Sequence, residues 1–269
     1  MPELTNSKIP PPDRQTVEEL RKQVLEEIEK SPESYYAEDV KRLKDDDEFV
    51  KRFIVHQALL HPSEDRLKNG IAMAKKEFKW RKENSIREIK RDELPTEFFD
   101  RQVIVPYNRD KNGCCTVFLR AKKVRRTSSA EKQDLERFVT YWIESVESIN
   151  PGEMFTIIID CTGAGLSNAN MDLLTLLINM VKEHYLAIVG HIIVANLPSI
   201  LVATWKIVKY LLPPAAVEKV KFVDNKTIGE YIEEDRLPPH LGGTNNQEFG
   251  YYPFIFAENY PKCNDTRMV

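Results

Sequence analysis

The sequence predicts an α/β fold in which an all-helical lobe precedes a lobe built on a mostly parallel sheet. Apolar residues recur at helical spacing through roughly the first ninety residues. Short, uniformly apolar segments then alternate with amphipathic ones, which is typical of parallel strands joined by helical crossovers. The predicted lobes span residues 14–92 and 93–252, after a disordered leader at 1–13 and before a C-terminal tail at 253–269.

The composition is that of a globular protein in a reducing compartment. Of the 269 residues, 42% are hydrophobic and 30% are charged, and the net charge of −3 argues against nucleic acid as a partner. The four cysteines form no C-x-x-C pair and no evident disulfide framework. The N-terminus lacks the apolar core of a signal peptide, and the longest uncharged stretch, 184–205, is broken by polar residues and a proline. A cytoplasmic location is expected.

The first lobe carries the helical pattern most clearly. Asp46 or Asp47 can cap the helix that contains Phe49, and Ser63 can cap the next one. The predicted helices cover 16–30, short segments within 35–60, and a segment that ends near 81–86.

The second lobe alternates strands with helices. Its strand 153–163 is apolar almost throughout, which is typical of a strand buried on both faces. The predicted strands are 101–108 and 115–125, which form a hairpin, then 153–163, 189–197 and 217–224. The predicted helices are 128–148, 170–185, 199–212 and 227–234.

The turn after Asp160 could suggest a nucleotide site. Gly163 and Gly165 fit the first two positions of G-x-G-x-x-G, but Asn168 occupies the third. A glycine turn in which Asn168 or Asn170 caps a helix explains the segment with fewer assumptions.

Other enzyme signatures are weaker still. The sequence has no G-x-S-x-G serine and no H-E-x-x-H or paired-cysteine spacing for zinc. The position of His191 within a predicted strand favours a core residue. We therefore expect no enzyme, no cofactor and no metal site.

A basic segment follows the second predicted strand and ends in the pattern R-R-x-S. It contains Lys122, Lys123, Arg125 and Arg126 ahead of Ser128. Such a segment can contact anionic lipid headgroups or serve a basophilic kinase. A solvated strand end is the favoured interpretation.

The predicted helix 199–212 is apolar on nearly every side, with Lys206, Lys209 and Tyr210 as its main polar breaks. Such a helix is either wholly buried or covers something apolar that is not protein. Composition alone slightly favours a central core helix.

The order of these features resembles the CRAL-TRIO family of lipid-binding and lipid-transfer domains. The likeness covers about 40–252 and rests on "FKWRKENSI", the strand that ends at Asp160, "WKIVKYLLPP" and "LPPHLGGT". Within the family, the sequence is most similar to the CRAL-TRIO domain of motile sperm domain-containing proteins. That resemblance implies a VAP-like domain and a membrane anchor, so a single-domain relative, an isoform or a fragment is expected.

The resemblance implies a hydrophobic pocket that is closed by a mobile gate helix, here 199–212. The implied lipid-binding residues are Phe155, Ile157, Ile159, Ile178, Val194, Leu197, Ile200, Leu201, Ala203, Thr204, Lys206 and Val208. Trp205, Lys209 and Leu212 would contact the membrane when the gate opens.

Departures from the phosphatidylinositol-transferring members bear on the ligand. Arg52 and Lys206 match, but Leu186 and Ala187 replace a proline and a glutamate, and Ala203 replaces a threonine. A more apolar ligand, or none, is therefore expected rather than a phosphoinositide headgroup.

The expected function is binding of a small hydrophobic lipid-like ligand, with lipid binding or transfer at membrane surfaces. The alternatives are a protein-interaction or membrane-tethering domain with a vestigial pocket and, third, an α/β enzyme. The expected partners are a lipid, a transient membrane surface that includes organelle membranes, and a protein at membranes in the tethering alternative. "LPPHLGGT" is expected to fold the end of the chain back over the second lobe, because Gly242 and Gly243 permit a turn that bulkier residues resist.

Overall fold

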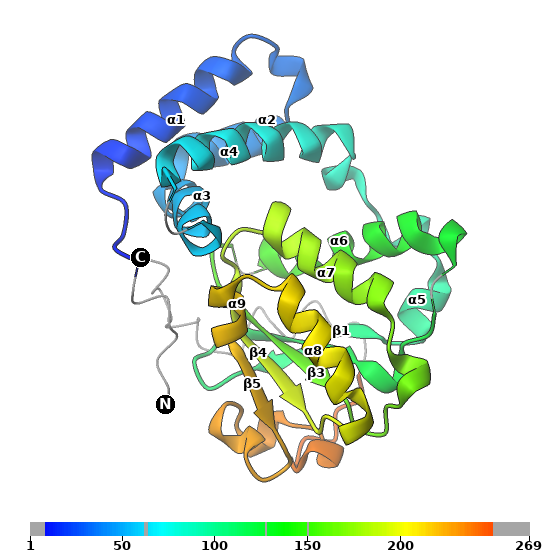
Figure 1. Ribbon diagram of the computed structural model, residues 1–269. Helices are drawn as coiled ribbons and strands as arrows, with labels where there is room; N and C mark the ends of the chain where they lie inside the picture. The colour runs from blue at the N-terminus through cyan, green and yellow to red at the C-terminus, as the bar shows by residue number, and fades with distance from the viewer. Residues whose placement is uncertain (1–8, 62–63, 127, 150, 250–269) are drawn as a thin grey trace. The chain divides into compact units, whose positions relative to one another are not determined.

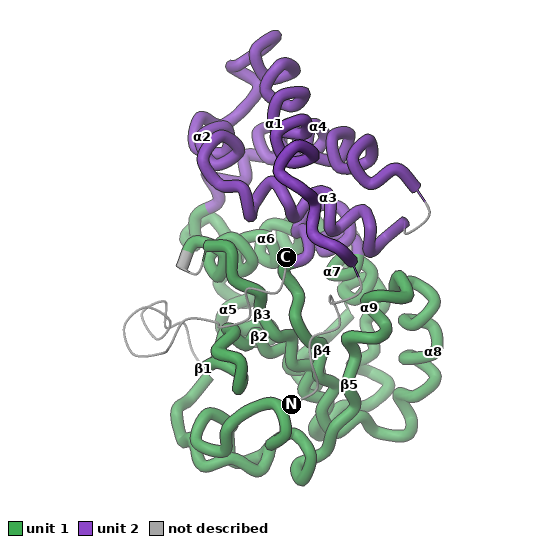
Figure 2. The backbone as a smooth tube through the Cα atoms, turned by 90° about the vertical axis from the view of Figure 1, so that its left-hand side faces the viewer, with its two compact units in different colours: residues 1–4, 90–178, 188–266 green, residues 5–89, 179–187, 267–269 purple. Residues whose placement is uncertain are grey.

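The computed structural model describes residues 9–61, 64–126, 128–149 and 151–249. These residues divide into a helical unit, 9–89 with 179–187, and an α/β unit, 90–178 with 188–249 (Figure 2). The predicted boundary at 92/93 lies close to this division, whereas the assignment of 179–187 to the helical unit was not predicted. Most of the predicted leader and the whole predicted tail at 253–269 lie outside the described residues.

The helical unit has an aspartate at the start of three of its helices. Asp13 accepts a hydrogen bond from the amide of Thr16, and Asp46 accepts one from Phe49, as predicted. The cap of the fourth helix is Asp65, because its carboxylate accepts from two successive amides of the first turn. Ser63, which was predicted to cap this helix, lies outside the described residues. The α-helices are α1 (Arg14–Ile28), α2 (Ala37–Asp45), α3 (Asp47–Leu60) and α4 (Arg66–Glu83), and 3-10 turns lie at Pro32–Ser34 and Ile86–Glu88.

The core of the helical unit forms where the apolar sides of these helices meet. Phe53 and Phe78 stack with ring centroids 6.1 Å apart, and both are buried. Leu186, from the segment 179–187, packs in the same core. His56 accepts from the amide of Ala187 through Nδ1, so its Nε2 donates to the carbonyl of Lys182. These contacts explain why the segment belongs to this unit.

The α/β unit contains a five-stranded sheet in the order β1-β2-β3-β4-β5 (Figure 1). β1 and β2 form the predicted antiparallel hairpin, and every later pair is parallel. The strands are β1 (Ile104–Arg109), β2 (Cys115–Arg120), β3 (Phe155–Asp160), β4 (Val189–Ala195) and β5 (Val220–Val223).

The helices of this unit largely match the prediction, except for one wrong helix near the end of the chain and two short helices, Thr96–Asp100 and Pro214–Glu218, that were not predicted. The predicted helix 227–234 is wrong, because the structure has separate 3-10 turns there, at Ile228–Glu230 and Glu234–Arg236. Gly229 lowers the helix propensity of this short segment. The α-helices are α5 (Thr96–Asp100), α6 (Lys132–Ile149), α7 (Met171–Glu183, which ends within the helical unit), α8 (Val202–Leu211) and α9 (Pro214–Glu218). Further 3-10 turns lie at Arg91–Glu93, Ala121–Lys123, Ser129–Glu131, Leu166–Asn168, Ser199–Leu201 and Pro239–Leu241.

One face of the sheet is sealed by the segment that contains "LPPHLGGT". Its core consists of Val105, Tyr107, Phe118, Ile158, Ile193 and Ala195 from the sheet, and Ile228, Ile232, Leu237 and Leu241 from the covering turns. Gly242 has a φ of +85°, which favours glycine. A Cβ on Gly243 would lie 2.0 Å from the carbonyl oxygen of Leu237. The turn therefore requires both glycines where it folds back over the sheet.

The cysteines of the sheet region are buried. Burial raises the pKa of the Cys161 thiol to about 12 and raises that of Cys115 further, so neither is a reactive thiolate.

Candidate functional site: a partly exposed sheet face beneath helix α8

The other face of the sheet carries two rows of apolar side chains that cross the parallel strands. Residues in register on neighbouring strands point to the same face, so each row is contiguous. The first row is Val117, Ile157, Ile192 and Val220, and the second is Leu119, Ile159, Val194 and Phe222. Ile104 on β1 extends the second row, because it pairs with Leu119.

The two faces of the sheet differ in burial although the same strands form both. On the sealed face, Ile158 and Ile193 are 0% exposed. On the other face, Leu119 and Val194 are buried, but Ile157 and Ile159 are only partly buried and Phe222 is 48% exposed. Exposed apolar area costs about 25 cal/mol per Å² relative to burial, so this face would gain free energy from an apolar cover.

Helix α8 lies over this face, in front of the strands and beside α7 (Figure 1). The ring of Trp205 meets Phe222 edge to face, with centroids 5.1 Å apart. No side chain of α8 itself is fully buried, and the preceding Leu201 is 6% exposed. The interpretation of this helix as a central core helix is therefore wrong.

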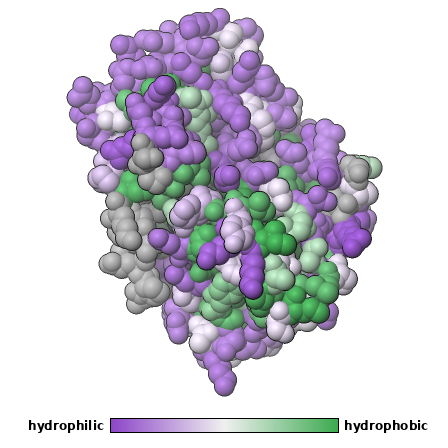
Figure 3. All heavy atoms as spheres, in the orientation of Figure 1, coloured by the Kyte–Doolittle hydropathy of each residue, from purple (hydrophilic) through white to green (hydrophobic). Residues whose placement is uncertain are grey.

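The outward side of α8 carries several apolar side chains beside Lys206 and Lys209. Figure 3 shows hydrophobic side chains gathered over this part of the α/β unit. The exposed members on α8 and the turn before it are Ile200, Val202, Ile207, Tyr210 and Leu211, of which Tyr210 is 90% exposed and Ile207 is 55% exposed. An apolar group of this kind on a surface is typical of an interaction site.

The predicted lipid-binding residues fall into three groups by burial. Phe155, Val194 and Leu201 are buried; Ile157, Ile159, Ile178, Leu197, Thr204 and Val208 are partly buried; Ile200, Ala203 and Lys206 are exposed. The strand members share the partly exposed face, and the others come from α7, α8 and the segment before α8. Of the predicted membrane-contact residues, Lys209 is exposed, and Trp205 and Leu212 are partly buried. Their roles stay predictions.

Comparison with known proteins identifies the family. The CRAL/TRIO domain model matches residues 100–243, which is more than half of the chain. The chain belongs to the CRAL/TRIO domain family. Apart from residues 179–187, the matched segment lies in the α/β unit, and it includes the strands, α8 and the glycine turn.

Two curated relatives come from Schizosaccharomyces pombe (strain 972 / ATCC 24843). The CRAL-TRIO domain-containing protein C3H8.02 is 28% identical over 148 residues, which are 54% of this chain and 33% of that protein. The CRAL-TRIO domain-containing protein C23B6.04c is 22% identical over 193 residues, which are 70% of this chain and 18% of that protein. The chain therefore spans a third or less of each relative.

The fold is also similar to a solved structure. The crystal structure of Sfh5 aligns with a TM-score of 0.66 at 14% identity and covers 88% of both chains. This likeness supports the predicted fold class of a helical lobe followed by an α/β lobe with a mostly parallel sheet.

The carboxyl ends of the CRAL/TRIO strands hold a polar network. Nε2 of His240 lies 2.8 Å from the Asp160 carboxylate, and Asn196 donates to Thr162 and to Asn225. Burial raises the pKa of Asp160, but hydrogen bonds from His240 and Thr162 outweigh it, so this pKa lies below its usual value. The network ties the glycine turn to the sheet.

In this CRAL/TRIO domain, the loop with Gly163 and Gly165 supports the interpretation that an asparagine caps the following helix. Asn170 accepts from the amide of Leu173 and so caps α7. Asn168 accepts from the amide of Gly165, and its side-chain nitrogen donates to the carbonyls of Lys122 and Val124. Asn168, which breaks the nucleotide fingerprint, thus holds the loop against the basic segment.

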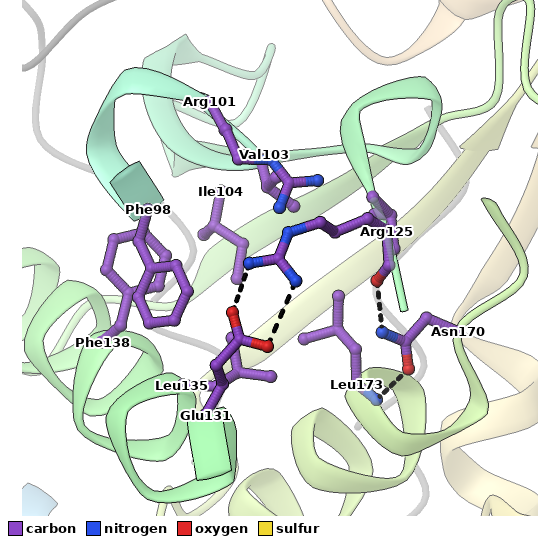
Figure 4. A pocket seen from close by; sticks show the side chains of 11 residues that line it. Phe98, Arg101, Val103, Ile104, Arg125, Glu131, Leu135, Phe138, Asn170 and Leu173 are labelled. Carbon is purple, nitrogen blue, oxygen red and sulfur yellow. Dashed lines mark hydrogen bonds and ion pairs between the residues drawn. The ribbon is translucent and has the colours of Figure 1, made fainter. Parts of the chain in front are cut away.

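A small pocket near β1 was not predicted as a site. Figure 4 shows the rings of Phe98 and Phe138 at one end of it, and the paired side chains of Arg125 and Glu131 among apolar neighbours. Its lining residues are Phe98, Arg101, Val103, Ile104, Val124, Arg125, Glu131, Leu135, Phe138, Asn170 and Leu173. The sequence feature that could have indicated this pocket is the capping box from Ser128 to Glu131, next to the basic segment.

Arg125 and Glu131 form the charged side of this pocket. Hydrogen bonds from Arg125, then from Ser128, lower the pKa of Glu131 to about 2. Arg101 and Arg125 both line the pocket, and burial, then the Arg125 charge, lower the pKa of Arg101. Two guanidinium groups in one pocket can bind an added anion in exchange for the carboxylates that now contact them.

His191 on β4 is buried and lies near two lysines. Burial, then Lys221 and Lys219, lower the pKa of His191 to about 4, which fits a neutral histidine in a strand. The described residues contain no group of three or more side chains suited to a metal ion. Among the described helices, none is both long and apolar enough to cross a membrane.

Proposed function

We propose that this chain binds a small hydrophobic, lipid-like ligand between the partly exposed sheet face and α8. CRAL/TRIO domains in general bind lipophilic ligands. The observation that carries the proposal here is the unequal burial of the two sheet faces. Ile157 and Ile159 keep exposed area on one face while Ile158, between them, has none. An acyl chain or a similar apolar body over these residues would remove that area from water.

In this proposal α8 is the lid and also the membrane contact. Its inner side meets the sheet through Trp205, and its outer side exposes Ile207 and Tyr210. Lys206 and Lys209 are exposed on the same helix, and each contributes roughly 1 kcal/mol of attraction near an anionic bilayer surface. The chain would then act in the cytoplasm as a lipid-binding or transfer module, peripheral on membranes.

The ligand proposed for this site is mainly apolar. The sheet rows and the inner side of α8 supply isoleucine, valine, phenylalanine and tryptophan, with Thr204 as a polar member. Ala203 cannot supply the hydroxyl that phosphatidylinositol-transferring members place there. The closer resemblance to motile sperm domain-containing proteins stays a prediction.

Native mass spectrometry of the full chain purified from cells tests the ligand. We expect one co-purified lipid per chain and its displacement by an excess of a competing fluorescent lipid. A chain that stays empty, and that takes up no lipid from vesicles, would contradict the proposal and favour the tethering alternative.

A matched pair of variants tests the membrane contact. Ile207→Glu adds a charge to the apolar side of α8, whereas Leu166→Glu adds one at a 60% exposed leucine of the turn Leu166–Asn168. We expect vesicle sedimentation to fall about fivefold or more for Ile207→Glu, because its carboxylate must be desolvated to insert. Equal binding of the two variants would exclude α8 as the contact.

A further inference from the structure

Ser128 closes the R-R-x-S sequence, and the proposed lipid site makes no use of it. Its side chain is exposed, and it precedes the turn Ser129–Glu131 that leads into α6. We propose that Ser128 is a phosphorylation site for a basophilic protein kinase, and that its phosphate replaces the Glu131 carboxylate beside Arg125. This inference does not depend on the ligand.

The local geometry already contains an anion-binding arrangement around the Ser128 hydroxyl. The Oε2 atom of Glu131 lies 2.6 Å from Oγ of Ser128 and 2.9 Å from its amide nitrogen. Nη1 of Arg125 donates to the same Oε2 at 3.1 Å, and Nη2 donates to Oε1 of Glu131 and to Glu97. The guanidinium thus lies one carboxylate away from the oxygen that would carry the phosphate.

The segment also presents what a basophilic kinase recognises. Arg125 and Arg126 lie three and two residues before Ser128, and Arg126 is exposed. In the transfer, Oγ of Ser128 forms a bond to the γ-phosphorus of ATP as the bond to the β–γ bridging oxygen breaks. ADP leaves, and the hydroxyl proton passes to the catalytic base of the kinase.

The added charge determines how the phosphate rearranges these contacts. A phosphoserine carries about −1.5 to −2 at pH 7 and three acceptor oxygens, whereas Glu131 carries a single negative charge. The phosphate repels Glu131 and competes with it for Arg125, with Arg101 lining the same pocket (Figure 4). It also remains at the start of a helical segment, where negative charge is favoured. Glu131 then leaves the capping position and the charged side of the pocket.

Phosphorylation of the folded full chain is the first test. With Mg-ATP and a purified kinase selective for R-R-x-S, we expect a mass increase of about 80 Da that peptide mapping places at Ser128. Ser128→Ala should abolish it, and Arg126→Ala should lower the kinase kcat/KM at least about tenfold, since one charged contact is lost. Labelling elsewhere, or labelling of Ser128 only after unfolding, would overturn the proposal.

Phosphorus NMR tests the new partner of the phosphate. The second pKa of phosphoserine is about 6 when no cation is held against it. In the folded phosphoprotein we expect this pKa to be lower than in the same protein in urea, because Arg125 stabilises the dianion. Glu131→Gln should lower it further by removing the competing carboxylate. Equal values in the folded and unfolded protein would show that the phosphate does not engage Arg125.

Discussion

The two faces of the sheet are built by the same strands and differ in what covers them. Phe118, Ile158 and Ile193 are at most 1% exposed beneath turns that the chain itself supplies after β5. Ile157, Ile159 and Ile192 alternate with them and remain partly exposed beneath α8. Strand composition therefore does not decide which face is filled. The covering segments decide it, and the incompletely covered face is the one proposed to hold a ligand.

The largest expected effect comes from a substitution that disrupts the turn covering the sealed face. Gly243→Ala would place a Cβ 2.0 Å from the carbonyl oxygen of Leu237, so backbone must move. We expect a loss of about 4 kcal/mol in unfolding free energy, near the upper end for point mutations. Gly165→Ala is the control, because a Cβ there meets nothing within 4 Å. Chemical denaturation should separate the two, and similar midpoints would show that the glycine turn is not a rigid cover.

The next largest effect is the difference in unfolding free energy between variants at two adjacent residues of β3. Ile158→Ala creates a cavity in the sealed core and should cost about 3 kcal/mol. Ile159→Ala removes a side chain that is already partly in water, so about 1 kcal/mol is expected. Urea denaturation of the two variants measures the difference. Equal losses would mean that both faces are packed alike, which would remove the main support for the ligand site.

Much of the fold was predictable from periodicity. The strand 153–163 and the hairpin were predicted because apolar runs and turn residues are local signals, and β1 to β3 lie within the predicted segments or one residue beyond. The segment 227–234 was misassigned because a sequence window does not show that short 3-10 turns can seal a sheet. The assignment of 179–187 to the helical unit depends on tertiary contacts of His56, which no local pattern encodes.

The candidate site was less predictable than the fold. From composition alone, α8 could be a core helix or a cover, because its burial depends on neighbouring elements that its own sequence does not specify. The resemblance resolved that choice toward a cover, and the exposure of Ile207 and Tyr210 agrees. The pocket around Arg101 and Arg125 was missed because its lining comes from α5, β1, the basic segment, α6 and the start of α7. Of this lining, the capping box from Ser128 to Glu131 is the part that the sequence shows.

The smallest expected effect concerns the contact that ties the glycine turn to β3. Asp160 has a folded-state pKa below its usual 3.8, so it contributes stability above that pH. The contribution is lost as pH falls through the lower folded-state pKa. Asp160→Asn should therefore cost about 1 kcal/mol at pH 7 and almost nothing in strong acid.

Urea midpoints measured from pH 7 down to acid test this pH dependence. His240→Gln is the matched variant, because it removes the imidazole that lies 2.8 Å from the carboxylate. If the Asp160–His240 contact holds the cover, the two substitutions should be non-additive when combined, since each alone breaks the same pair. Additive losses, or a loss that grows in acid, would show that the cover is held by apolar packing and the glycine turn alone.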